Sequence, residues 1–395
     1  AVVCLYGIGG ATDLEAIGAR LRSTDADISG MARVLLPAAI GMAIAGAAFR
    51  LAAVPMHFYA PDVYQGTSPG NAAVLSTLPK LAGLVVLARL LGLAVAPDAA
   101  APFVGQAARD HLALLWQITA VLAAVTMTVG NVMALVQRNL RRLLACSSIA
   151  HAGYLLVGVA VAAAAAATQA ARPLGDAAGI ETRWVFGLGG MTAAVFYLVT
   201  YALATIGVFA AVAYLGHRWP EWTSGSGARP PREEITTVAD LDGLASTNPV
   251  AAFALALFLL SLAGIPPLPG FWGKLALAAS ALEVDWNDPV TFGSRRWWFV
   301  GLAVVLVLNA AIAAGYYLRI IVAMYFRGTK RGVQADGGLA AGIAMLACTA
   351  LVLGATLQPQ GLFRAASRAG DGLRGARPAA VAADAPPVPA ATASR

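Results

Sequence analysis

Long apolar runs separated by short polar stretches dominate the 395-residue chain. Most runs approach the ~20 residues that an α-helix needs to cross a bilayer. The pattern predicts about eight full crossings and a partial one, an apolar fragment over residues 1–10. The expected crossings are 32–65, 69–95, 112–137, 143–165, 187–215, 249–283, 297–326 and 338–358.

Two of these segments carry prolines inside the membrane. The first contains Pro55 and Pro61, and the second contains Pro266, Pro267 and Pro269. Proline has no backbone N–H and interrupts a helix, and broken helices in transporters mark ion sites near the bilayer midplane. We therefore predict an all-α polytopic membrane protein, a helix bundle with two Pro-broken transmembrane helices.

Composition and charge agree with a single membrane domain. The chain is 59% hydrophobic and 12% charged, against about 25% charged residues in soluble domains. The net charge of +7 lies largely in loops and the tail, which indicates membrane topology and lipid contact rather than nucleic-acid binding. The short Arg-rich connections at 138–142 and 327–331 favour a cytoplasmic location for their side.

Two long segments fall outside the crossings. Residues 216–248 form the longest internal loop, where an amphipathic surface helix is expected. Residues 361–395, rich in Ala, Pro and Arg, are predicted to be a disordered tail that follows a membrane domain over 1–360. The chain begins without Met inside an apolar run, so we expect further sequence upstream.

Buried charge in this chain is cationic, because no acidic residue lies between Asp110 and Asp176 or between Asp242 and Glu283. A cation at a helix centre costs about 2.5–3.5 kcal/mol, so it needs a partner, water or a function. Lys80 follows Pro79 well inside its span. Burial favours a neutral amine, so this lysine can take up and release protons. Alternatively, Lys80 is pinned to a carbonyl freed by Pro79.

Lys274 and Arg50 flank the two breaks. Lys274 follows the second break, in the first turns of a half-helix whose positive end disfavours a protonated amine, which suggests a proton-release site. An interfacial lysine is the alternative. Arg50 ends the first half-helix, where free carbonyls favour a cation. Because arginine stays protonated, Arg50 can set a potential but not relay a proton, unless it is only a structural cap.

Hydroxyl groups form a stripe between these cations. Tyr197, Tyr201 and Thr205 recur at four-residue spacing on one helix face. With His151 they can line a water file between Lys80 and Lys274. Such stripes also join helices by hydrogen bonds, and His151 can equally be a hydrogen-bonded residue near a helix end.

Cofactor and metal motifs are not predicted in this chain. The GIGG at 7–10 and GLGG at 187–190 follow no strand, so a dinucleotide loop is not expected. The three cysteines are far apart and lack the spacing of a metal or redox site.

Three long motifs resemble a known family. They are RLAAVPMHFYAPDVYQG (50–66), GNVMALVQRNLRRLLACSSIAHAGYLLVG (130–158) and SLAGIPPLPGFWGK (261–274). Over residues 1–360 the chain resembles subunit N of the proton-pumping NADH–quinone oxidoreductase, respiratory complex I. The resemblance implies an antiporter-like fold of fourteen helices with two inverted repeats. The chain would then begin within the sixth helix.

The resemblance also implies roles. The family's central lysine falls on Lys80, the lysine of its twelfth helix falls on Lys274, and Arg50 replaces the lysine of its seventh. The implied function is proton translocation coupled to quinone reduction in other subunits. NADH, FMN, iron–sulfur clusters and quinone are expected in those partner subunits of the membrane and peripheral arms. The implied location is a bacterial inner membrane.

Two other functions stay open. A subunit of a multi-subunit cation/proton antiporter has a similar fold and similar lysines, although the APDVYQG motif favours subunit N. A non-conducting structural subunit is favoured if the protein truly starts at Ala1, because half of one repeat would then be missing.

Overall fold

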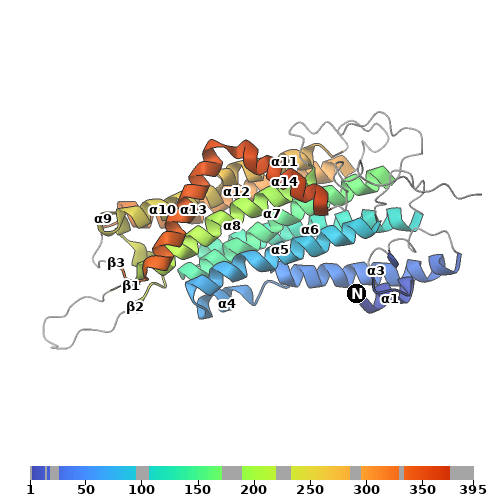
Figure 1. Cartoon of the computed structure of the whole chain (residues 1–395), viewed down its shortest axis with the longest axis horizontal. Helices are drawn as coiled ribbons and strands as arrows, with labels where there is room; N and C mark the ends of the chain where they lie inside the picture. Colours follow the sequence, from blue (N-terminus) through green and yellow to red (C-terminus); the bar gives the residue numbers. More distant parts are fainter. Residues whose placement is uncertain are drawn as a thin grey trace, which may run out of the picture.

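The computed structural model describes residues 2–13, 16–17, 26–94, 106–170, 189–218, 233–284, 295–328 and 333–373. Its long helices lie side by side along the longest axis of the molecule (Figure 1). At the N-terminal side, α1 (Val2–Gly9) contacts α3 (Ala26–Leu51).

Six helices within the described residues are long and apolar enough to cross a membrane. They lie in α5 (Pro69–Ala94), α6 (Gln106–Val136), α7 (Leu140–Ala170), α8 (Gly190–Leu215), α12 (Arg295–Phe326) and α13 (Leu339–Leu357). Two shorter apolar helices, Pro37–Leu51 of α3 and α10 (Pro249–Ala263), adjoin the breaks. This is a multi-pass, all-α membrane protein.

Helix α7 forms the centre of the bundle. Of its most apolar window 89% is buried, against 17% for α13. It contacts α4 (Ala60–Gly66), α5, α6, α8, α11 (Pro269–Leu282) and α12. A Cβ at Gly153 would lie 2.5 Å from the backbone nitrogen of Met127, so glycine is what lets α6 and α7 touch here. Side chains on α7 therefore face neighbours on every side.

Both predicted breaks are present. Helix α3 ends at Leu51, four residues before Pro55, and the N–H of Ala53 donates to the carbonyl of Ala48 (2.8 Å). Helix α10 ends at Ala263, and Gly264 follows with φ +86° while its N–H donates to the carbonyl of Leu260. A left-handed residue after the last turn is the usual way a helix stops. Each break thus leaves helix-end carbonyls inside the bundle.

A small sheet contains both described ends of the loop predicted over residues 216–248. Strands β1 (Gly216–Arg218), β2 (Glu233–Glu234) and β3 (Val333–Ala335) pair antiparallel in the order β2-β1-β3. After β2 come η2 (Val238–Leu241) and α9 (Leu244–Thr247), so the described part of this loop holds no long surface helix. Residues 219–232 lie outside the described residues. The central strand depends on Val333–Ala335, which no local pattern could reveal.

We call the end of the bundle that carries this sheet the sheet end. The described arginines of the two connections predicted to be cytoplasmic lie here, together with Arg218 of β1: Arg138, Arg141, Arg142, Arg218 and Arg327. They come from three separate connections because successive long helices alternate in direction (Figure 1).

Helix α14 (Pro359–Leu373) corrects the prediction of a disordered tail from residue 361. The ring of Phe363 stacks on Phe196 of α8 with centroids 3.8 Å apart, and Ala366 is buried. Its apolar residues recur at helical spacing while Arg364 and Arg368 stay exposed, so one face can pack on α8. Residues 374–395 lie outside the described part of the chain.

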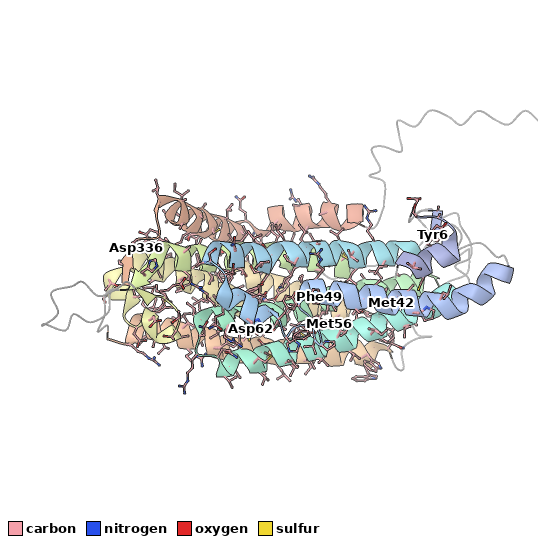
Figure 2. The ribbon with its side chains drawn as sticks, turned by 90° about the horizontal axis from the view of Figure 1, so that it is seen from below. Tyr6, Met42, Phe49, Met56, Asp62 and Asp336 are labelled. Atoms are coloured by element: carbon pink, nitrogen blue, oxygen red, sulfur yellow. The ribbon has the colours of Figure 1, made fainter. Side chains whose placement is uncertain are left out.

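The outer surface of the bundle is apolar. Val74, Leu78 and Leu81 of α5 are 49–58% exposed, and Figure 2 shows Met42 and Phe49 on the outer side of α3. Such faces are suited to lipid or to neighbouring apolar helices rather than to water.

Candidate functional site

Lys80 lies in the middle of α5 and is 2% exposed. Its Nζ donates to the Oγ of Ser148 on α7 (2.6 Å), and it lies 5.5 Å from the centroid of the Tyr201 ring. Pro79 does not interrupt α5. The hydrogen-bond partner of this lysine is therefore a side chain of another helix rather than a carbonyl freed by the proline.

Ser148 gathers several polar groups around its hydroxyl. Besides Lys80, the hydroxyl of Tyr201 donates to Ser148 Oγ (2.9 Å), and the hydroxyl of Tyr64 lies 3.3 Å from it. All are buried. Hydroxyl groups both donate and accept, so this cluster can accommodate either protonation state of Lys80.

His151 lies one turn further along α7, enclosed by tyrosines. Its Nδ1 contacts the hydroxyl of Tyr197 on α8, and its Nε2 lies 3.0 Å from the hydroxyl of Tyr317 on α12. Its ring also lies 4.7 Å from that of Tyr201. Both ring nitrogens thus have partners that can exchange protons, and the residue lies mid-helix rather than near a helix end.

Lys274 reaches back across the second break. Its Nζ donates to the carbonyls of Leu262 (2.9 Å) and Ala263 (2.8 Å), which are the last two residues of α10. It is 5% exposed and lies 5.0 Å from the centroid of the Tyr154 ring. The prediction considered only the positive start of its own helix. The nearest dipole in fact comes from the carbonyl end of α10, which attracts a cation.

His151 connects the two lysines in space. Its ring contacts Tyr201, which shares Ser148 with Lys80, and it contacts Tyr154 (5.7 Å between centroids), which lies beneath Lys274. Both ammonium groups act on the His151 ring electrostatically. Lys80, His151 and Lys274 thus form one buried polar core built from α5, α7, α8 and α11.

Arg50 lies apart from this core. It is in the last turn of α3, and its side chain is exposed. Its neighbour Leu51 is buried, and a Cβ at Gly83 of α5 would lie 2.9 Å from Leu51. The end of α3 therefore packs one turn from Lys80, while Arg50 is exposed, as is its neighbour Phe49 (Figure 2). This differs from the predicted set of three buried cations.

Two of the three residues of the predicted hydroxyl stripe contact the buried polar core. Tyr197 and Tyr201 both contact His151, and Thr205 is buried further along α8. Ser148, Tyr154 and Tyr317 also belong to this core, although they were not among the predicted site residues. Ser148, His151 and Tyr154 recur every three residues in an otherwise apolar helix, which places them on one face. That spacing was the available signal.

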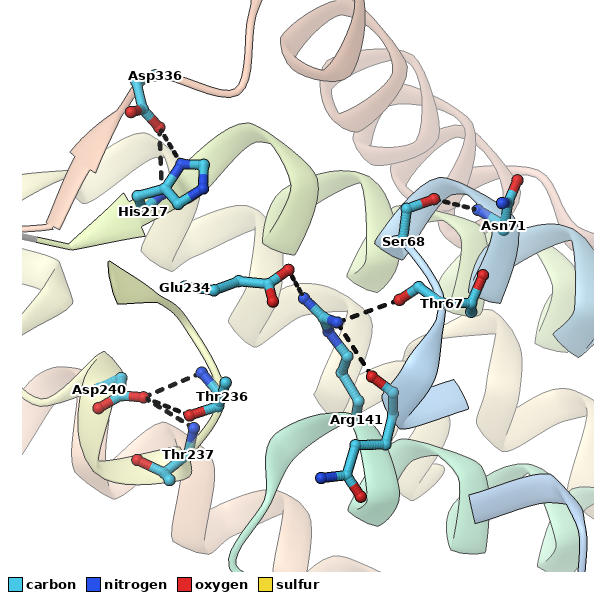
Figure 3. Close-up of polar contacts among 11 residues, drawn as sticks. Thr67, Ser68, Asn71, Arg141, His217, Glu234, Thr236, Thr237, Asp240 and Asp336 are labelled. Atoms are coloured by element: carbon cyan, nitrogen blue, oxygen red, sulfur yellow. Dashed lines mark hydrogen bonds and ion pairs between the residues drawn. The ribbon is translucent and has the colours of Figure 1, made fainter. Parts of the chain in front are cut away.

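A second polar cluster lies at the sheet end. Arg141 is 6% exposed, and it donates to the carbonyls of Gln65 (3.3 Å) and Thr67 (3.1 Å) and to the carboxylate of Glu234 (Figure 3). It links the connection between α4 and α5 to β2. Within the described residues no three His, Cys, Asp or Glu side chains come together as a metal site would need.

Two broken helices and buried lysines around a central helix define an antiporter-like membrane protein. Residues 1–172 and 182–297 match the model of the family described as NADH:quinone oxidoreductase/Mrp antiporter, TM. The chain belongs to this family.

The chain is similar to NADH-quinone oxidoreductase subunit N 2 of Roseiflexus castenholzii. The two are 34% identical over 362 residues, which cover 89% of this chain and 60% of the relative. The chain therefore spans about three fifths of the length of this curated relative.

Solved structures agree in fold. A chain of respiratory complex I from Thermus thermophilus with bound aureothin is 27% identical, with a TM-score of 0.59 and coverage of 92% of this chain and 64% of that one. A chain of the Mrp complex from Dietzia sp. DQ12-45-1b is 22% identical, with a TM-score of 0.63 and coverage of 94% and 64%. The second likeness concerns the fold alone.

Proposed function

We propose that this chain is a proton-translocating membrane-arm subunit of NADH–quinone oxidoreductase. The observation that carries the proposal is the pair of fully buried lysines joined through His151. Burying two amines away from water costs free energy in a membrane protein. A proton path between them explains why both are present. The family and the likeness to subunit N of other bacteria support the same function.

The proposed path runs from Lys80 to Lys274. A proton leaves Lys80 Nζ for the Ser148–Tyr201 hydroxyl pair, passes through ordered water to His151, and continues past Tyr197 and Tyr154 to Lys274. Thr205 lies at the far end of the same stripe on α8. Each transfer breaks one N–H or O–H bond as the next forms, so no charge is stranded between the lysines.

Arg50 acts on this path as a fixed charge. Because its guanidinium stays protonated, it biases the protonation of Lys80 without exchanging protons. On its exposed face it is suited to a carboxylate of a neighbouring helix.

The redox chemistry lies elsewhere in the proposed assembly. NADH, FMN, iron–sulfur clusters and quinone bind to partner subunits, and the bilayer and other membrane-arm subunits surround this chain. We propose the inner membrane of a bacterium as its location, because the similar subunits come from bacteria.

The test is proton pumping by the assembled complex in vesicles. Lys80→Ala and Lys274→Ala should each lower the rate of proton translocation by at least about tenfold, as loss of a proton-transfer group does. Arg50→Lys should keep most of it, because the charge remains. Arg89→Ala, an exposed cation on the same helix as Lys80, is the matched control. Normal pumping in Lys80→Ala would end the relay hypothesis and favour a non-conducting structural subunit.

A cation/proton antiporter subunit is the second candidate, because the family description includes Mrp antiporters and the Mrp complex shares the fold. Purification distinguishes the two functions. A subunit of NADH–quinone oxidoreductase should co-purify with quinone-reducing partners, and a cation/proton antiporter subunit should not.

A further inference from the structure

A second buried polar network runs between α6 and α12. Asn131 is 0% exposed and Asn309 is 3% exposed, and the Asn131 Nδ2 donates to both the carbonyl (3.2 Å) and the Oδ1 (3.0 Å) of Asn309. The Asn309 Nδ2 donates to the hydroxyl of Thr128 (3.1 Å). We call Thr128, Asn131, Asn309, Tyr316 and Arg319 the α6–α12 seam.

The seam connects to the buried core through two adjacent tyrosines. The hydroxyl of Tyr316 donates to the Oδ1 of Asn131 (3.0 Å). The rings of Tyr316 and Tyr317 lie 4.5 Å apart, and their hydroxyls interact. Tyr317 in turn contacts Ser147 and the Nε2 of His151. Hydroxyl groups thus lead from His151 to the seam.

The other end of the seam reaches the sheet end. Arg319, one turn after Tyr316, donates to the carbonyls of Leu135 (2.9 Å) and Gln137 (2.6 Å). These residues lie at the end of α6, which stops at Val136, directly before the Arg138–Arg142 connection. The seam therefore extends from the centre of the bundle to the boundary where water begins.

Packing of α6 against α12 does not by itself require the polar residues of the seam. A single hydrogen-bonded pair suffices to join two membrane helices, and the outer neighbours Val132 and Leu308 are 51% and 58% exposed apolar residues. Beneath that apolar surface Thr128, Asn309, Asn131 and Tyr316 are hydrogen-bonded in series, and Arg319 lies one turn beyond Tyr316 towards the sheet end. A proton path requires a series of hydrogen-bond donors and acceptors that leads from a titratable group, here the His151 ring, towards one end of the bundle.

We propose that the α6–α12 seam is a hydrated side branch through which His151 exchanges protons with the aqueous phase at the sheet end. The inference rests on the proposed function and adds an access route to it. A proton leaves His151 Nε2 for the Tyr317 oxygen as the proton of that hydroxyl moves on to the next oxygen. The amides of Asn131 and Asn309 hold the water that carries it further, and Tyr317 is the link to the main path.

The first test measures water access and does not depend on pumping. In the assembled complex, with Cys4, Cys146 and Cys348 replaced by alanine, Asn131→Cys and Asn309→Cys are treated with a membrane-impermeant methanethiosulfonate reagent from each side. The control is Thr119→Cys, which is equally buried on α6 but whose hydroxyl bonds only to carbonyls of its own helix. Arg138→Cys, at an exposed position of the sheet end, marks full access from that end.

A hydrated seam should let Asn131→Cys or Asn309→Cys react from the sheet end at least about tenfold faster than Thr119→Cys, because thiol reactivity follows solvent access. Rates as slow as those of Thr119→Cys at both positions would overturn the side branch and leave the lysine relay intact.

The second test is kinetic. Tyr316→Phe removes one hydroxyl and should slow proton translocation by about fivefold, less than the loss of a group on the main path, because the route from Lys80 to Lys274 remains. Tyr214→Phe, a half-buried tyrosine on α8 away from the seam, should leave the rate unchanged. Normal translocation in Tyr316→Phe, with Lys80→Ala inactive, would refute the branch alone.

Discussion

The two buried lysines have partners of different chemistry. Ser148 can accept from a protonated Lys80 or donate to a neutral one, because a hydroxyl does both. The carbonyls of Leu262 and Ala263 only accept, so Lys274 must donate to them in either state. Lys80 is thus suited to passing a proton on. Lys274 is held against the end of a helix, and its position depends on the shape of the break.

Gly264 makes this position of Lys274 possible. A Cβ there would lie 2.9 Å from the Cδ of Lys274, and the residue has φ +86°. Gly264→Ala should therefore displace the lysine as well as strain the backbone by about 1–2 kcal/mol. We expect proton translocation by the complex to fall several-fold, by about the amount that a misplaced proton-transfer group costs.

Gly338 provides the matched control for that substitution. It has φ +91°, and nothing lies within 4 Å of the Cβ position. Gly338→Ala should lower the thermal stability of the complex as Gly264→Ala does, yet leave the pumping rate unchanged. Equal pumping losses in the two variants would show that backbone strain, and not the lysine, is responsible.

At the scale of elements, helix ends create the site. Each break stops a helix inside the bundle and leaves carbonyls there that a continuous helix would consume. At the second break Lys274 uses two of them. Helix α14 differs from the two broken helices. It lies along α8, and side-chain packing rather than a helix break determines its position.

The stack of Phe363 on Phe196 should hold α14 in place. Phe363→Ala removes that contact, and we expect local opening of α14 to become easier by about 1–3 kcal/mol, because an aromatic packing surface is lost. Amide hydrogen exchange over 359–373 should then be about fivefold to 150-fold faster. Arg368→Ala, on the exposed face, should leave the exchange as it is. Unchanged exchange in Phe363→Ala would mean that other contacts hold the helix.

At the scale of the whole molecule, Arg141 joins three separate parts of the chain at the sheet end. It comes from the start of α7, and it bonds to the connection before α5 and to β2 (Figure 3). Its neighbour Arg142 bonds to Asp62 and Gln65, but its side chain is 35% exposed. The two arginines therefore differ in burial more than in the kind of contact they make.

Arg141→Met should lower the free energy of unfolding by about 2–3 kcal/mol, because two carbonyls lose a charged donor in a place that water barely reaches. The half-exposed Glu234 adds little to this, since solvent screens it. Arg142→Met should cost at most about 1 kcal/mol, as exposed ion pairs do. Thermal denaturation of the purified complex in detergent compares the two. A smaller loss for Arg141→Met than for Arg142→Met would contradict the assignment.

The chain's own pattern was enough to establish its membrane helices, its two breaks and the cationic character of its interior. Apolarity summed over about 20 residues and the missing N–H of proline are properties of contiguous residues, so they can be recognised without a structure. Lys80 and Lys274 stood out for the same reason, because a charge inside an apolar run is visible locally.

Tertiary structure alone decided which residues meet. Asn131 and Asn309 are 178 positions apart. The partners of the lysines and of His151 come from other helices, Ser148 and Tyr154 from α7 and Tyr317 from α12. In a soluble protein the apolar face of a helix tells which side is buried. In a bilayer the lipid-facing side is apolar as well, so the apolar residues gave no signal for which side of each helix faces the protein interior. Arg50, expected inside and found exposed, is the clearest result of that ambiguity.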